Sequence, residues 1–248
     1  MSRTGLLVGA AIVALGAASG VRAGSAYLES QVTTGAVMGQ PARTSTQKMW
    51  FSDDRIRVDH GDEGSYSVIR RDQGKVYIID AKKKTYAEMT LEQMKAMAEM
   101  GMAMMGNKDG AAPKVELTRT AETAKIGEWT ATKAILTVAA GPMQTEMTLW
   151  VSKDIALDMK AWADVAQSMG MRGMMGDMAE KMATLEGYPV KQDSTVNMMG
   201  MKITSSSELK VFKPGPVEAS LFEVPAGFTK TEGMLPGMPA GAGAGRGK

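Results

Sequence analysis

The stretch that decides the fold is Thr44–Met89, TSTQKMWFSDDRIRVDHGDEGSYSVIRRDQGKVYIIDAKKKTYAEM. Short runs rich in β-branched and aromatic residues recur at intervals of about ten residues, and each ends in a polar turn. Within Arg55–His60, Ile56 and Val58 alternate with polar residues. Period-two alternation between regular turns is typical of antiparallel strands with one buried face. We therefore predict an antiparallel meander over this stretch.

The first 23 residues predict a secretory signal peptide. Arg3 supplies a basic start, Gly5–Ala18 is an uncharged apolar run, and Val21–Ala23 has the small-residue pattern of a cleavage site. The apolar run is shorter than the roughly 20 residues that a membrane anchor needs. We expect cleavage before Gly24 or Tyr27, which leaves a mature chain that does not span the membrane.

The cysteine count and the net charge exclude several kinds of anchor and partner. The 248 residues include no cysteine, which excludes disulfides and the acceptor of a lipid anchor. Loss of Arg3 and Arg22 with the signal peptide reduces 29 basic side chains to 27, against 27 acidic ones. This balance favours neither nucleic acid nor anionic lipid as a partner. We expect a soluble periplasmic or secreted protein that carries no lipid anchor.

Two later segments change to a helical period and contain many of the 24 methionines. The first begins at Thr90, where Gln93 three residues later completes a capping box, and it is predicted to end near Gly106. The second is Asp158–Leu185, where Trp162 and several methionines recur at spacings of three and four residues. Both segments are predicted to be amphipathic helices.

The other segments alternate as strands do, and we predict a single sheet. The additional strands are predicted at Tyr27–Val37, Lys114–Ala121, Gly127–Val138, Met143–Val151, Tyr188–Met198, Met201–Phe212 and Leu221–Val224. Sequential strands favour antiparallel pairing, so we expect an α+β fold whose strongly curved sheet has Met-rich helices covering its concave face. Residues 231–248, mostly Gly, Ala, Pro and Met, are predicted to be a disordered tail.

Several short segments resemble a known family in their order and spacing. They are Arg55–Val58, Val76–Asp80, Lys84–Tyr86, Ile126–Trp129, Leu149–Ser152 and Leu221–Phe228. Together they resemble the secreted bacterial family called domain of unknown function 4412, and the arrangement is similar to the LolA and LolB periplasmic lipoprotein carriers. The resemblance spans residues 27–228 and implies one open half-barrel domain over residues 24–230. In the carriers, a cavity under the helices takes lipoprotein acyl chains.

The residues offer little for catalysis. His60 is the single histidine, and it lies in the turn-forming segment Asp59–Glu63. A metal centre or a catalytic triad requires more partners than this segment supplies. We therefore predict no catalytic residue, no metal site and no cofactor, so the protein is not expected to be an enzyme.

The methionines allow three interpretations. The first is a soft wall for a lipid or another apolar ligand, in a carrier or a sensor. The second is a filled core in a structural or partner-binding envelope protein. The third is Cu(I) capture by thioethers, with Asn197–Met201 as the nearest candidate. The first interpretation is our main hypothesis, and it does not identify the ligand. The predicted ligand-binding residues are Leu91, Met94, Met97, Met105, Trp162, Met171, Met174, Met175, Met178 and Met182.

Overall fold

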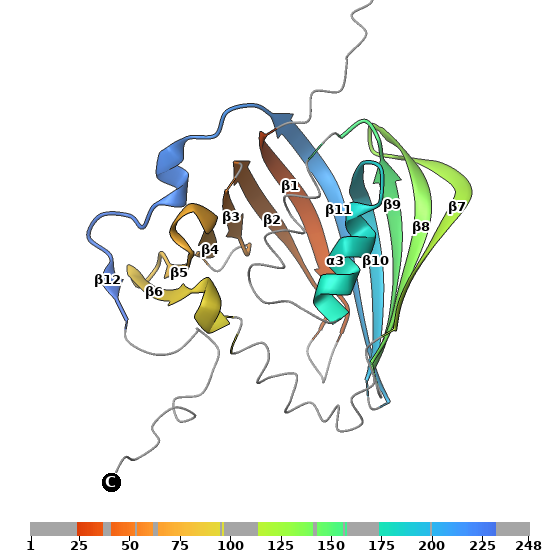
Figure 1. Cartoon of the computed structure of the whole chain (residues 1–248), viewed down its shortest axis with the longest axis horizontal. Helices are drawn as coiled ribbons and strands as arrows, with labels where there is room; N and C mark the ends of the chain where they lie inside the picture. Colours follow the sequence, from red (N-terminus) through yellow and green to blue (C-terminus); the bar gives the residue numbers. More distant parts are fainter. Residues whose placement is uncertain are drawn as a thin grey trace, which may run out of the picture.

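Twelve strands form one open sheet in the computed structural model of the protein (Figure 1). The structure describes residues 24–36, 41–52, 54–61, 64–94, 96, 114–140, 143–155, 157, 174–198 and 200–231. The strands are β1 (Ser25–Thr34), β2 (Arg43–Ser52), β3 (Arg55–Asp59), β4 (Ser65–Arg70), β5 (Lys75–Asp80), β6 (Thr85–Thr90), β7 (Lys114–Ile126), β8 (Trp129–Ala140), β9 (Met143–Ser152), β10 (Tyr188–Met198), β11 (Met201–Pro214) and β12 (Thr229–Lys230). The helical elements are α3 (Met174–Ala183) and the 3-10 helices η1 (Arg71–Gln73) and η2 (Ala219–Phe222).

The predicted α+β fold with a helical cover is wrong, because the described chain is nearly all β. In that part of the chain, the only α-helix longer than one turn is α3, which packs on β7, β8 and β9. Figure 1 shows the sheet bending around this helix, so we call the face that it occupies the concave face. The sheet also carries an apolar cluster on its opposite face, and the C-terminal segment, which is not an α-helix, covers that cluster.

β1 lies in the middle of the sheet and joins two meanders. Across the sheet the order is β12-β6-β5-β4-β3-β2-β1-β11-β10-β9-β8-β7. Neighbours are antiparallel, as predicted, except that β12 pairs with β6 in parallel. The pairing of β1 with β11 brings Ser30 opposite Leu209, and a bulge lies between Glu29 and Ser30. This long-range pairing places the opening strand beside one of the last.

The core of the concave face is a row of side chains that crosses the first meander. The strand registers align Ala26, Phe51, Ile56, Ile69 and Val76 on five adjacent strands. Each of them is at most 9% exposed. Because burial of a large apolar side chain contributes about 1.5–3 kcal/mol, this row is a main source of the meander's stability.

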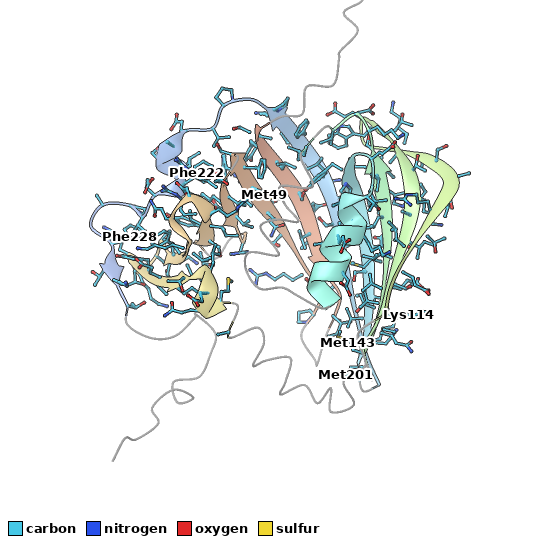
Figure 2. All side chains as sticks on the ribbon, viewed as in Figure 1. Met49, Lys114, Met143, Met201, Phe222 and Phe228 are labelled. Atoms are coloured by element: carbon cyan, nitrogen blue, oxygen red, sulfur yellow. The ribbon has the colours of Figure 1, made fainter. Side chains whose placement is uncertain are left out.

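The opposite face of the same meander is also covered, which the sequence analysis did not predict. A cluster of Tyr66, Val68, Tyr77 and Ile79 packs around Phe222 of η2. We call residues 215–231 the C-terminal strap, because they run from the end of β11 to β6, where β12 of the strap forms the edge of the sheet, as the blue trace in Figure 1 shows. Figure 2 labels two of its aromatic residues, Phe222 and Phe228. The predicted closing strand at Leu221–Val224 is therefore wrong.

Several local predictions are confirmed. The Thr90 hydroxyl accepts from the Gln93 amide nitrogen at 3.0 Å, and the Thr90 amide donates to the Gln93 side chain at 2.9 Å. This reciprocal pair is the predicted capping box, and a helical turn follows at residues 91–94. The β10–β11 hairpin turns at Gly200, whose φ of 81° suits glycine. In β9, Met147, Leu149 and Val151 are buried as the alternation predicted.

Other predictions concern residues that the structure does not describe. The signal peptide, the tail from residue 232 onward and most of both Met-rich segments lie outside the described residues. The domain bounds of 24–230 stay a prediction. Within the described part of the chain, no helix combines the length and the apolar character needed to cross a membrane.

Candidate functional site

A cavity of about 360 Å³ opens on the concave face where β1 and β2 meet β10 and β11. Met182 of α3 lies at one side of it, and Met49 of β2, labelled in Figure 2, lies in its wall. Its lining residues are Leu28, Ser30, Val32, Gln47, Met49, Phe51, Leu157, Met182, Tyr188, Pro189, Gln192, Ser205, Ser206 and Ser207.

Strand alternation explains how these residues come together. Leu28, Ser30 and Val32 occupy every second position of β1, so their side chains project to one face. The register then places Val32 opposite Ser207, and Ser207 opposite Gln192 on the next strand. Serine side chains are small, so the wall at β11 leaves space that larger residues would fill. The cavity is thus a product of the β1–β11 pairing.

The cavity has an apolar part and an uncharged polar part. Leu28 and Phe51 are buried in the core cluster of the concave face, and Leu157 belongs to the same cluster. Ser30 and Gln47 are direct partners across β1 and β2 and supply hydroxyl and amide groups. The Gln192 side-chain nitrogen donates to the sulfur of Met147 at 3.4 Å, and Met147 belongs to the buried cluster on β8 and β9. Such a wall can hold an apolar group and hydrogen-bond an uncharged one.

The pKa of Tyr188 shows that its surroundings in this wall disfavour a charged group. Burial raises the pKa of its phenol to about 12, because the surroundings disfavour the phenolate. The phenol therefore stays protonated at neutral pH and offers a neutral hydroxyl. A group with such a pKa is poorly suited to general acid–base catalysis near pH 7.

Of the predicted ligand-binding residues whose side chains the structure describes, Met182 alone lies in the cavity wall. Met178 packs against the cluster on β8 and β9, away from the cavity lining. Leu91 and Met94 pack against the core of the concave face and do not line the cavity either. Met174 and Met175 belong to α3, but their side chains are outside the description. The residues that lie wholly outside the described part are Met97, Met105, Trp162 and Met171.

Sequence reasoning missed most of the wall. The alternation predicts that Leu28, Phe51 and Gln47 lie in strands, and it predicts no role for the serines at 205–207. The one available signal was the run Ser205–Ser207 inside a strand that has larger apolar side chains on either side of it, such as Ile203 and Leu209. Small polar residues at inward positions of a strand leave room for a ligand, but their partners become known only with the strand register.

His60 lies at the end of β3 and is exposed, as a turn residue should be. Its Nε2 is 2.9 Å from the Ser67 hydroxyl. Among the described residues, no group of three His, Cys, Asp or Glu side chains could hold a metal ion. We expect His60→Ala to change the free energy of unfolding by at most about 0.5 kcal/mol, the usual range at exposed positions. Urea denaturation measures this value, and a loss of several kcal/mol would contradict the surface role.

The Cu(I) hypothesis stays a prediction. At the β10–β11 hairpin, Met198 pairs with Met201 on one side and with Met143 of β9 on the other. Met201 is 39% exposed. Met199 lies outside the described residues, so the structure does not define a thioether site there.

The fold and the cavity define a class of protein: an open, nearly all-β sheet with a ligand-sized hollow on its concave face. The particular family is the one described as Domain of unknown function (DUF4412), and the chain belongs to it. The family model matches residues 36–228, which confirms the resemblance noted in the sequence.

Three solved structures that resemble this chain have low sequence identity and low TM-scores. PNGF-II has a TM-score of 0.39 and 14% identity, over 84% of this chain and 31% of that one, so the chain spans less than a third of its length. A DUF1329 family protein from Desulfovibrio piger has a TM-score of 0.34 and 11% identity, over 81% of this chain and 90% of that one. The haemoglobin receptor HpuA from Kingella denitrificans has a TM-score of 0.19 and 14% identity, over 82% of this chain and 47% of that one. No curated protein matches the chain.

Proposed function

We propose that the protein is a non-enzymatic binding protein of the cell envelope that takes up a lipid or another apolar ligand, as a carrier or a sensor. The observation that carries the proposal is the cavity of about 360 Å³ on the concave face. Ligand sites commonly span about 300–1,000 Å³ and are mostly apolar, with a few polar groups. The cavity falls at the small end of this range, which suits one small ligand.

Two further observations support this function. A hollow among the described residues beside Leu28 and Phe51 is unexpected in a purely structural protein, since protein interiors are close-packed. Met182 at the cavity wall has three rotatable bonds and a polarizable sulfur, so it can repack around ligands of different shape. The envelope location rests on the signal peptide that the first 23 residues predict.

The cavity can be tested by filling it. In Ser30→Phe, a ring at an inward position of β1 would occupy space between Gln47 and Leu209, the two cross-strand partners of Ser30. We expect the wild-type protein to bind the neutral probe N-phenyl-1-naphthylamine with a rise in fluorescence. Ser30→Phe should weaken this binding by at least about tenfold, a loss of roughly 1.4 kcal/mol.

Gln31→Phe is the matched control. Gln31 is the next residue of the same strand, is exposed, and projects to the opposite face. The Gln31→Phe substitution adds the same ring outside the cavity, so probe binding should stay at the wild-type level. If the wild-type protein binds no probe, or if both variants lose binding equally, the cavity does not bind ligand and the proposed function is wrong.

A further inference from the structure

The described wall of the cavity carries hydrogen-bonding groups but no charge. None of its fourteen described lining residues is Asp, Glu, Lys or Arg. The polar members are serines, two glutamines and the phenol of Tyr188. Hydroxyl and amide groups can both donate and accept hydrogen bonds, so they suit uncharged polar groups of a ligand.

The charged residues of the same strands occupy the alternate positions. Glu29 of β1 and Lys48 of β2 are direct cross-strand partners on the face away from the cavity. Lys191 and Asp193 of β10 flank the lining residue Gln192, and their charged atoms lie 3.5 Å apart. Strand alternation therefore places these four charges on the face away from the cavity, and the described residues on the cavity face are uncharged.

Among the described residues of this wall, a charged head group would find no counter-ion. Removing an ion from water costs several kcal/mol unless a partner of opposite charge or several hydrogen bonds compensate. The raised pKa of Tyr188 reflects the same penalty, because burial disfavours its charged form. An uncharged head group avoids this cost and can still bond to Gln47 and Ser30.

We propose that the cavity selects electrically neutral amphiphiles, with an apolar chain against Leu28 and Phe51 and a hydroxyl- or carbonyl-bearing head group at Gln47. The selection rests on the proposed function, since it specifies which apolar ligands the same site takes. Fatty acid anions and cationic amphiphiles of equal chain length are discriminated against by desolvation of their charge.

The test compares three probes that share a twelve-carbon chain. Monolaurin is neutral, laurate is anionic at pH 8, and dodecyltrimethylammonium is cationic. Calorimetric titration of the protein below the critical micelle concentrations should give monolaurin at least about tenfold tighter binding than either ion. If laurate or the ammonium probe binds within about threefold of monolaurin, charge selection is refuted while apolar binding stands. If none of the three binds and N-phenyl-1-naphthylamine also fails, the proposed function itself is wrong.

A charge placed in the wall tests the position of the head group. Gln47→Lys supplies a cation beside Ser30, so the affinity for laurate should rise by at least about tenfold relative to the wild type. Gln31→Lys adds the same charge on the opposite face and should leave laurate binding unchanged, which separates a local effect from a change in net charge. Circular dichroism confirms that each variant is folded. If laurate binding is equal in both variants, the head group does not lie at Gln47 and the placement is overturned.

Discussion

Phe222→Ala is expected to lower the free energy of unfolding by about 3–5 kcal/mol, the range for truncating a buried aromatic side chain. Phe222 is 1% exposed and packs against Tyr66, Val68, Tyr77 and Ile79. In a chain of this size, 1 kcal/mol shifts the thermal midpoint by about 2–4 °C, so the midpoint should fall by on the order of 10 °C. Urea denaturation followed by circular dichroism measures the free energy directly.

Ser220→Ala provides the control for this substitution. Ser220 lies in the same 3-10 turn but is exposed, so its truncation should cost no more than about 0.5 kcal/mol. Because Phe222 lies on the face opposite the cavity, folded Phe222→Ala should still bind N-phenyl-1-naphthylamine. A loss of stability below about 1 kcal/mol would mean that Phe222 does not anchor the C-terminal strap.

The sequence predicted the meander because its information is local. Alternation over Arg55–Asp59, the turns between hairpins and the capping box at Thr90 each involve residues close in the chain, and all are present in the structure. The burial of β4 and β5 on both faces also has a local signal in the sequence. Consecutive apolar residues, as in Val76–Ile79, are typical of strands covered on both faces.

The strap and the cavity were not predicted because both depend on contacts across most of the chain. Leu221–Val224 looks like a strand in isolation, but packing of Phe222 against residues about 150 positions earlier makes it a 3-10 turn. The β1–β11 register similarly decides that Ser207 lies opposite Val32. Methionine abundance drew attention to the helices, whereas the described cavity wall is formed mainly by strands.

Arg70 holds the strap from the sheet side, and its replacement has the second large expected effect. Arg70 is 5% exposed, and its Nε and Nη2 donate to the two carboxylate oxygens of Asp72, each at 2.8 Å. Nη1 donates to the carboxylate of Glu223 and, at 3.4 Å, to the carbonyl of Phe222. These bonds raise the pKa of Arg70 above its ordinary value and so favour the charged form, although burial opposes them.

Arg70→Met should lower the free energy of unfolding by about 3 kcal/mol, because hydrogen bonds to charged groups contribute about 1.5–3 kcal/mol each. The freed carboxylates of Asp72 and Glu223 are partly exposed and regain hydration, which limits the loss. Arg70→Lys keeps the charge but cannot form the bidentate pair. Its free energy of unfolding should therefore lie between those of the wild type and Arg70→Met.

The pH dependence distinguishes the ion pair from simple packing of the Arg70 side chain. Hydrogen bonds from Arg70 are the largest cause of the lowered pKa of Asp72. A carboxyl with a depressed folded-state pKa contributes stability above its unfolded pKa of about 3.9 and loses it as pH falls through the folded value. The stability difference between wild type and Arg70→Met should therefore be full at pH 7 and smaller at pH 3. A difference that is the same at both pH values would show that Arg70 stabilises the strap by packing alone.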